Sequence, residues 1–312
     1  MSGKVKIPTW ADFPPDFPPF FLDPAGCVLS VKEIGKNTYA LVSSIMNVDN
    51  AGFVVGEKGV LVIDAHISVP MARQILQRVR EVTDKPILYL VNSNYHADHT
   101  FGNCAFPAET LIVQHRETAA RVPFHQEARD FLFRCTGSDP HIWDDVTLRL
   151  PDIVFADHLT IDLGGGMVVE LHFFGAANTP GDTITYVPHA KAAWTGNMTG
   201  GGTFGLAIET DAPTFMGTLS RFIHALDAET LVPAHSPLSG PETLWSGINY
   251  YAQVTGAVNK ALGAGWSLEE TLARTPLGQE FAFSPTDDRL KLQQARHRYN
   301  VRRTYLSLTG RI

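Results

Sequence analysis

The sequence has few cysteines, no long apolar run and no basic cluster beside its most distinctive motif. Its 3 cysteines form no Cys-x-x-Cys pair, which fits reduced thiols in a cytosolic protein. No run of about 18 apolar residues, the length that a membrane span needs, is present, and no apolar leader follows Met1. A net charge of −7 argues against nucleic acid as a partner. We therefore expect a soluble, cytoplasmic protein.

The chain is long enough to bury a large core. Its 312 residues are 44% hydrophobic, and its 26 glycines and 20 prolines fit the turn-rich loops of a layered α/β protein. We divide it into a Pro- and aromatic-rich arm (1–29), a catalytic domain (30–240) and a C-terminal helical extension of that domain (241–312).

A compact metal-ligand pattern stands at Asn94-Tyr95-His96-Ala97-Asp98-His99, directly after an apolar strand expected at Ile87–Val91. Imidazole nitrogens and carboxylate oxygens are what borderline-soft divalent metals prefer. Groups this close in sequence can converge on one point only from a tight loop. The pattern therefore favours a loop that binds, or once bound, a metal.

This stretch resembles the His-x-His-x-Asp-His signature of the metallo-β-lactamase superfamily, with asparagine in the first position. Other segments resemble further motifs of the family in the order that it requires, namely residues 52–56, 60–64, 175–182, 194–198 and 233–237. The resemblance covers about residues 30 to 240. It implies an α/β fold, a four-layer αββα sandwich, here with a C-terminal helical extension.

The resemblance also implies which residues would hold metal. The family's first metal corresponds to Asn94, His96 and Asn178, the second to Asp98, His99 and His235, and the bridging position to Asn197. All three asparagines thus fall on the first site or the bridge. A neutral amide cannot supply the charge that offsets dehydration of a divalent cation, so we expect the first site to bind metal poorly.

The second site is complete and keeps open coordination positions. Such a two-histidine, one-carboxylate set suits mononuclear zinc hydrolysis and equally suits non-haem ferrous iron or manganese. We expect one divalent metal ion, with zinc favoured. Candidate catalytic residues are Asp98, His66 and Asp182. His66 is interpreted as a replacement ligand, a general base, a hydrogen-bond partner of a ligand, or an ordinary loop histidine, and Asp182 as an orienting group.

Apolar periodicity predicts the elements that this fold requires. Strands are expected at 38–46, 51–56, 60–65, 87–91, 110–113, 153–163, 167–174, 184–187 and 192–196. Helices are expected at 70–82, 115–121, 212–225, 242–262 and 267–272, with a last helix capped by residues 284–288 and running to about 306.

Three segments outside the motifs have two interpretations each. The arm at 10–24 is a strap over the sandwich or a docking arm for a second subunit in a homodimer. The segment 123–150 is interpreted as an insertion covering the substrate, and its aromatic residues line an apolar pocket or pack in the core: Phe124, Phe131, Phe133 and Trp143. The last helix presents a solvated basic face, or binds an anionic substrate tail or an acidic carrier protein, through Arg289, Lys291, Arg296, Arg298, Arg302 and Arg303.

The chemistry that fits these features best is metal-assisted attack on a polarised carbonyl of a small-molecule ester, thioester or lactone. Alternatives are a polyketide cyclase or thioesterase acting on a carrier-bound acyl chain, a mononuclear non-haem iron oxygenase, and a catalytically silent binding relative. Two-zinc β-lactam hydrolysis is disfavoured because the first site and the bridge have lost ligands to amides.

Overall fold

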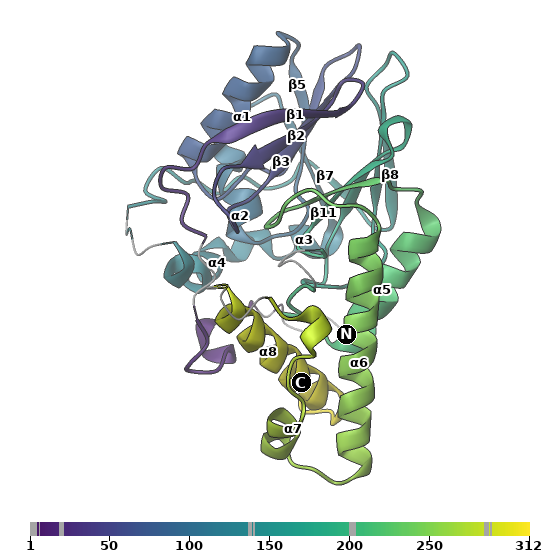
Figure 1. Ribbon diagram of the computed structural model, residues 1–312. Coiled ribbons are helices and arrows are strands. Elements are labelled where there is room, and N and C mark those ends of the chain that lie inside the picture. The colour runs from purple at the N-terminus through teal and green to yellow at the C-terminus, as the bar shows by residue number, and fades with distance from the viewer. Residues whose placement is uncertain are drawn as a thin grey trace.

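The computed structural model describes residues 5, 7–18, 22–136, 139, 141–199, 204–283, 287 and 289–312. In it two β-sheets face each other, helices cover their outer faces, and a helical region extends from one end (Figure 1).

The first sheet contains seven strands in sequence order. They are β1 (Leu29–Gly35), β2 (Thr38–Ser43), β3 (Ala51–Val55), β4 (Val60–Ile63), β5 (Ile87–Val91), β6 (Leu111–His115) and β7 (Ile153–Phe155). The first four pair antiparallel, and the strands from β4 to β7 pair parallel. All residues of β3 and β4 are buried, as expected for strands covered on both faces.

The second sheet has the strand order β12-β11-β10-β9-β8. Its strands are β8 (His158–Asp162), β9 (Val168–His172), β10 (Ile184–Val187), β11 (Ala192–Gly196) and β12 (Thr230–Pro233). Only the β11 and β12 pair is parallel among them. Apolar side chains of both sheets, such as Leu61, Leu171 and Trp194, meet in one buried cluster between the sheets.

Helices form the two outer layers. Helix α1 (Val69–Val82) buries Met71, Ala72, Ile75 and Val79, a helical spacing, against the first sheet. Helices α5 (Ala212–Ala225) and α6 (Glu242–Gly263) pack together against the second sheet through one core cluster. The predicted α/β sandwich with a C-terminal helical extension is therefore confirmed.

Three short helices lie between β5 and β7 in the chain, and two helices, one short and one long, complete the extension. They are α2 (Ala97–Thr100), α3 (Arg116–Ala119), α4 (His125–Leu132), α7 (Leu268–Arg274) and α8 (Leu290–Leu308). No helix in the described part of the chain is both long and apolar enough to cross a membrane.

The structure differs from the predicted elements in one strand and adds two strands and the helix α4, and one predicted cap is largely untested. The strand expected at 153–163 is two strands in different sheets, because the chain passes from β7 to β8 at residues 156–157. Strands β1 and β12 were not predicted. The cap expected at 284–288 lies largely outside the described residues, and α8 begins at Leu290.

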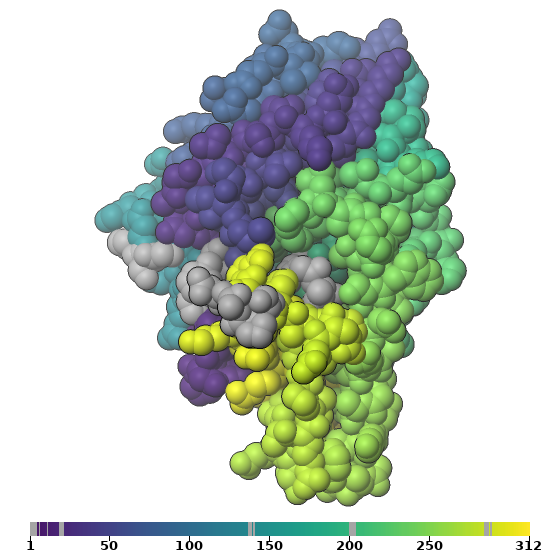
Figure 2. All heavy atoms as spheres, viewed as in Figure 1, coloured from purple at the N-terminus to yellow at the C-terminus, as the bar shows by residue number. Residues whose placement is uncertain are grey.

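The N-terminal arm packs between α4 and α8. Phe13 stacks on Tyr299 of α8, with ring centroids 4.6 Å apart, and lies 5.5 Å from Phe131 of α4. In Figure 2 the purple atoms of this segment lie beside the yellow atoms of the C-terminal helices. Within one chain the arm thus acts as a strap, while its use by a second subunit stays a prediction.

Candidate functional site

The predicted ligands Asp98 and His99 lie on α2, directly after the loop that follows β5. The Asp64 carboxylate at the end of β4 fixes the orientation of His99. Asp64 accepts hydrogen bonds from the Ser93 backbone N–H at 2.7 Å, the Ser93 hydroxyl at 2.6 Å and His99 Nδ1 at 3.0 Å. A histidine whose Nδ1–H donates to a carboxylate has its Nε2 available for a metal. Asp64 adopts this position with φ of 61°, a left-handed conformation that costs a non-glycine residue energy and that surrounding contacts must maintain.

His235 approaches Asp98 from the other sheet, two residues after β12. Its Nδ1–H donates to the Asn47 carbonyl at 2.8 Å, and its Nε2 lies 3.2 Å from Asp98 Oδ2. His99 Nε2 lies 3.8 Å from the same oxygen. The structure therefore brings together the three residues predicted for the second metal.

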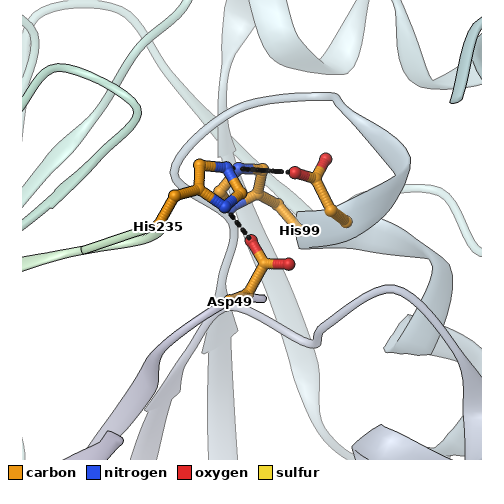
Figure 3. A group of neighbouring side chains, drawn as sticks. Asp49, His99 and His235 are labelled. Atoms are coloured by element: carbon orange, nitrogen blue, oxygen red, sulfur yellow. Dashed lines mark ion pairs between the residues drawn. The ribbon is translucent and has the colours of Figure 1, made fainter. Parts of the chain in front are cut away.

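Asp49 joins these three residues and was not predicted. Its Oδ1 lies 3.6 Å from His235 Nδ1 (Figure 3). One ligand atom from each of the four side chains can be chosen so that all lie within 4.8 Å of one another: Asp49, Asp98, His99 and His235. Two carboxylates and two imidazoles form a donor set that fits a zinc, iron or manganese ion.

Hydrogen bonding around the two carboxylates supports this fit. Both Asp49 oxygens and Asp98 Oδ1 are buried without a hydrogen-bond partner in the described chain. Buried charges are normally paired or bound to a metal, because desolvation of an isolated carboxylate is very costly. In the metal-free chain, burial accordingly raises the pKa of Asp49 to about 8.

In the other three side chains, the charges of neighbouring groups outweigh the effect of burial on the pKa. Burial raises the pKa of Asp98, but the neighbouring His99 and His235 outweigh it and hold that pKa below its usual range. Burial lowers the pKa of His99, but Asp64 and Asp98 outweigh it and raise that pKa overall. The same competition, with Asp49 and Asp98 as the partners, raises the pKa of His235. In the metal-free chain the negative charge of the group therefore lies on Asp98, between the His99 and His235 imidazoles.

Asp49 is held in place from both sides of the sandwich. The next residue, Asn50, donates its backbone N–H to the Ala234 carbonyl at 2.7 Å and its side-chain amide to the carbonyls of Pro233 and Ser236, both at 2.8 Å. These bonds join the loop before β3 to the loop that carries His235. A signal for Asp49 was present in the topology: because β3 runs antiparallel to β4, the residue before β3 lies at the same sheet edge as Asp64 after β4.

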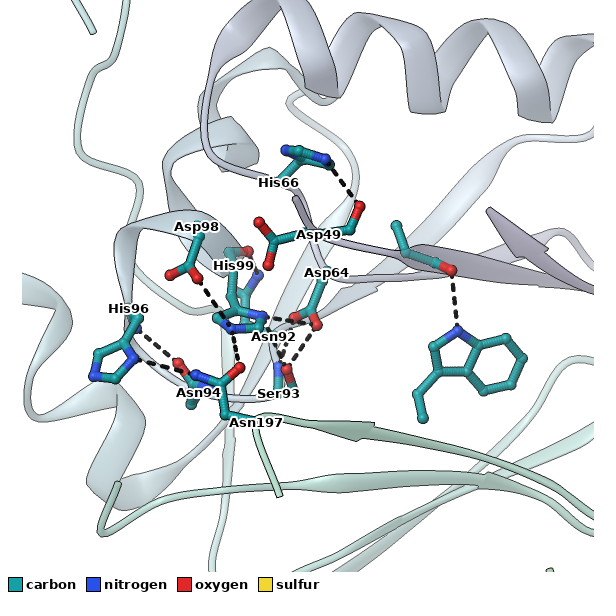
Figure 4. Close-up of polar contacts among 12 residues, drawn as sticks. Asp49, Asp64, His66, Asn92, Ser93, Asn94, His96, Asp98, His99 and Asn197 are labelled. Carbon is teal, nitrogen blue, oxygen red and sulfur yellow. Dashed lines mark hydrogen bonds and ion pairs between the residues drawn. The ribbon is translucent and has the colours of Figure 1, made fainter. Parts of the chain in front are cut away.

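Two of the three asparagines of the first metal position, Asn178 and Asn197, hydrogen-bond to each other, and Asn94 bonds the backbone. Figure 4 shows Asn94 and Asn197 beside His96 and His99. Asn197 Oδ1 lies 3.1 Å from His99 Nε2, and its Nδ2 donates to Asn178 Oδ1 at 3.2 Å. Asn178 Nδ2 in turn donates to the Leu206 carbonyl at 2.5 Å. Asn94 Oδ1 accepts from the His96 backbone N–H at 2.9 Å. None of the residues that these hydrogen bonds connect supplies a carboxylate in place of the lost ligands.

His96, the remaining predicted ligand of the first site, is buried and neutral. Its Nδ1 lies 3.4 Å from Asn197 Nδ2, and its Nε2 contacts no hydrogen-bond partner within the described residues. Burial lowers the pKa of His96 to about 4. His96 is separate from the group of four possible ligands described above.

His66 and Asp182 lie apart from the four clustered side chains. His66 Nδ1 accepts from the Ile67 backbone N–H at 2.9 Å, so its Nε2 carries the proton and donates to the Asp49 carbonyl at 3.1 Å. Of its four interpretations, this geometry favours the hydrogen-bond partner of a ligand residue. Asp182 Oδ2 accepts from the Thr179 backbone N–H at 2.6 Å, which closes a turn and agrees with an orienting role.

A cavity of about 60 Å³ opens onto the site, enough for several water molecules. His96, Asp98, Asn178, Asn197 and His235 line its polar part, and Leu22, Phe131, Leu132, Leu206 and Ile208 line its apolar part. Of the four aromatic residues in the segment 123–150, only Phe131 is among these lining residues. Trp143 is in the core, where its Nε1 donates to the Ile67 carbonyl at 2.9 Å.

The basic residues of α8 divide between this cavity and contacts within the chain. Arg296 lines the cavity. Arg298 lies 3.6 Å from Asp16, and Arg302 donates to the Asp12 carbonyl at 3.3 Å, so both contact the arm. Arg303 donates to the Thr210 carbonyl at 3.0 Å. Three of the six basic side chains of this helix therefore contact other parts of the same chain.

A second group of possible metal ligands, His158, Glu170 and His172, lies on the paired strands β8 and β9. His172 Nε2 lies 2.9 Å from Glu170 Oε2. His158 is exposed and the other two are half-buried. Any measurement of metal content must separate this surface group from the buried one.

Comparison with known proteins agrees with the fold. A family model described as the metallo-beta-lactamase superfamily matches residues 47–235. A linear primary-alkylsulfatase from Pseudomonas sp. (strain ATCC 19151) is 24% identical over 223 residues, which are 59% of this chain and 41% of that protein. The solved structure of a metallo-beta-lactamase from Pontibacter korlensis has 18% identity and a TM-score of 0.58, covering 72% of this chain and 99% of its own.

The stereoselective inverting sec-alkylsulfatase Pisa1 from Pseudomonas sp. is also similar in structure. It has 15% identity and a TM-score of 0.66, and the match covers 90% of this chain and 50% of that one. The chain thus spans half or less of the length of the alkylsulfatases it matches.

Proposed function

The chain belongs to the metallo-beta-lactamase superfamily, and on that premise we propose that it is a hydrolase of esters, thioesters or lactones with a single divalent metal ion. Asp98, His99 and His235 would hold the ion, with Asp49 as a fourth ligand. The observation that carries this proposal is the convergence of these four side chains around buried carboxylate oxygens that have no other partner in the described structure.

A metal bound there would polarise the substrate carbonyl or lower the pKa of a bound water. The protein's own residues supply orientation and charge. Asp64 and the Asn47 carbonyl fix the rings of His99 and His235. Asp98 lines the cavity and would contribute its negative charge to the bound ion. The apolar wall excludes bulk water, which strengthens these electrostatic interactions.

Zinc is the ion we favour, because the family's usual chemistry is hydrolytic. A second carboxylate adds an oxygen donor and keeps iron and manganese as alternatives. Metal analysis of protein purified without added metal identifies the ion: about one equivalent of zinc supports the hydrolase, and iron supports an oxygenase.

Two features bear on the substrate. The cavity wall formed by Leu22, Phe131, Leu132, Leu206 and Ile208 suits an apolar chain or ring. The similar proteins include two alkylsulfatases, so sulfate esters belong among the esters to be tested. The substrate is then a small amphipathic ester.

The test is turnover of matched substrates, namely an activated aryl ester, a thioester, a lactone and an alkyl sulfate. The proposal expects hydrolysis of at least one of them, at the same rate with and without oxygen, and loss of that activity in Asp98→Ala. Turnover that stops under anaerobic conditions and resumes with ferrous iron and oxygen would instead establish the oxygenase.

The remaining alternatives have less support. A cyclase or thioesterase acting on a carrier-bound polyketide would use the basic face of α8, but Arg298, Arg302 and Arg303 contact other parts of the same chain. A catalytically silent relative would have no need for buried carboxylates aimed at one point. Absence of bound metal together with absence of turnover on the whole substrate panel would favour the silent relative.

A further inference from the structure

The first metal position contains hydrogen-bond donors in place of its lost ligands. Asn178 and Asn197 use their amides on each other and on the Leu206 carbonyl. These two residues are therefore already satisfied by the protein, and they hold the neighbouring His96 in one orientation.

His96 has an N–H group directed at no acceptor. Its Nδ1 faces the Asn197 Nδ2 at 3.4 Å, and because an amide NH₂ can only donate, Nδ1 is the acceptor and Nε2 carries the proton. His96 is only 4% exposed, it lines the cavity, and Nε2 has no hydrogen-bond partner in the described structure. A buried donor without an acceptor costs roughly 1–3 kcal/mol. A ligand that accepts from Nε2 would remove this cost.

Asn94, two residues before His96, carries another buried donor, although it is not among the residues that line the cavity. Asn94 Oδ1 accepts from the His96 backbone, which leaves Asn94 Nδ2 buried and without a partner among the described residues. Neutral donors of this kind weaken binding of a cation and favour binding of an oxygen that carries negative charge.

Arg296 adds a positive charge to the same cavity. It reaches the cavity from α8, on the C-terminal extension. Burial lowers its pKa to about 10, so the guanidinium remains charged at neutral pH. A planar guanidinium pairs well with sulfate, phosphate and carboxylate groups.

We propose that the position of the lost first metal is an anion subsite, in which His96 Nε2–H and the Arg296 guanidinium bind an oxyanion such as sulfate. The proposal rests on the proposed function in one respect: there, the oxyanion would be the charged group of the ester, held beside the single metal ion. The family position that once bound a cation would thus bind the negative part of the substrate directly.

The test is calorimetric titration of the metal-loaded protein with inorganic sulfate, with metal content measured for every variant. His96→Ala and Arg296→Met should each weaken sulfate binding by about 10-fold or more, equivalent to about 1.4 kcal/mol. His96→Gln keeps an N–H donor and should restore part of the affinity. Arg298→Met, on the same helix but in contact with Asp16, is the matched control and should bind sulfate as the wild type does.

Three outcomes would overturn the proposal. They are no sulfate binding by the wild type, unchanged binding in His96→Ala, and loss of metal in His96→Ala, which would make His96 a metal ligand. Loss of the proposed function is a separate result, because His96-dependent sulfate binding without turnover of any ester would retain the subsite and reject the hydrolase.

Discussion

At the residue scale, Asp49 and His66 illustrate how one loop completes the site. His66 is fully buried and donates to the Asp49 carbonyl, while Asn50 ties the same loop to the residues around His235. His66 adopts a φ of 68°, a strained conformation for a non-glycine residue, which its two backbone hydrogen bonds help to maintain. His66 therefore contacts the group of four possible ligands through the Asp49 backbone carbonyl.

Asp49→Asn should weaken metal binding at least roughly 100-fold. Loss of a group that only supports a ligand weakens binding by up to about 100-fold, and loss of a ligand itself should weaken it at least as much. The amide keeps the size of the carboxylate but not its charge. Competition with a chelator of known affinity measures the change. The matched control is Asp182→Asn, which alters another buried aspartate, one that bonds Thr179, and should retain the metal. Equal metal affinity in Asp49→Asn and wild type would exclude Asp49 as a ligand.

His66 should make the metal-free protein sensitive to acid. Burial lowers its pKa from 6.5 to about 3. Between pH 6.5 and pH 3, His66 binds a proton in the unfolded chain but not in the folded chain. The contribution of neutral His66 to the free energy of unfolding is therefore fully present above pH 6.5 and decreases as the pH falls. The loss reaches at most about 2 kcal/mol at pH 5. His66→Gln, which retains a side-chain donor, should reduce the difference between denaturant unfolding at pH 7 and pH 5.

A matched variant, His224→Gln, changes an exposed histidine and should leave that pH difference as it is. An unaltered pH difference in His66→Gln would show that His66 titrates alike in the folded and unfolded protein.

At the scale of elements, apolar patterns predicted most strands and helices because both sheets and helices bury one repeated face. They could not predict sheet membership: residues 153–163 were expected to form one strand, but the chain changes sheets within this segment. Apolar patterns also could not predict Asp49 as a site residue, because Asp49 has no fixed spacing from the motif at 94–99. The pairing of β3 with β4 and the hydrogen bonds of Asn50 bring Asp49 close to His235. The family resemblance did predict that Asp98, His99 and His235 lie together, and they do because the loops after β5 and β12 meet at one edge.

The arm should be held by aromatic packing that also shapes the cavity. Phe13 is 4% exposed between Tyr299 and Phe131, and Phe131 and Leu22 line the cavity. Phe13→Ala should cost about 3 kcal/mol of packing free energy. It should also increase the rate of chymotrypsin cleavage in the arm and raise KM for the ester substrate at unchanged metal content. Phe133→Ala, at a side chain already 38% exposed, is the control. A Phe13→Ala protein as resistant and as active as wild type would mean that the arm does not depend on this contact.

At the scale of the whole molecule, both sheets contribute to the site: Asp49, Asp98 and His99 come from loops of the first sheet, and His235 comes from a loop of the second. The vacated position is likewise shared, since His96 follows the first sheet while Asn178 and Asn197 follow strands of the second. Metal binding should therefore depend on how the two sheets pack together.

Restoring the three lost ligands should restore the first metal. Imidazole and carboxylate supply the affinity that amides lack, so Asn94→His, Asn178→His and Asn197→Asp together should raise zinc stoichiometry from about one toward two. The same variant should lose sulfate binding at His96, because the ring would turn to the new metal. A stoichiometry that stays at one would show that some other feature of this side excludes the ion.

The most direct test of the central claim is metal stoichiometry combined with anomalous diffraction, in a His158→Ala, His172→Ala background that removes the surface group. We predict about one metal ion, located among Asp49, Asp98, His99 and His235. His99→Ala and His235→Ala should each abolish it, and Asn178→Ala should not. Two fully occupied ions, or one ion bound by His96 between Asn94 and Asn178, would contradict the account.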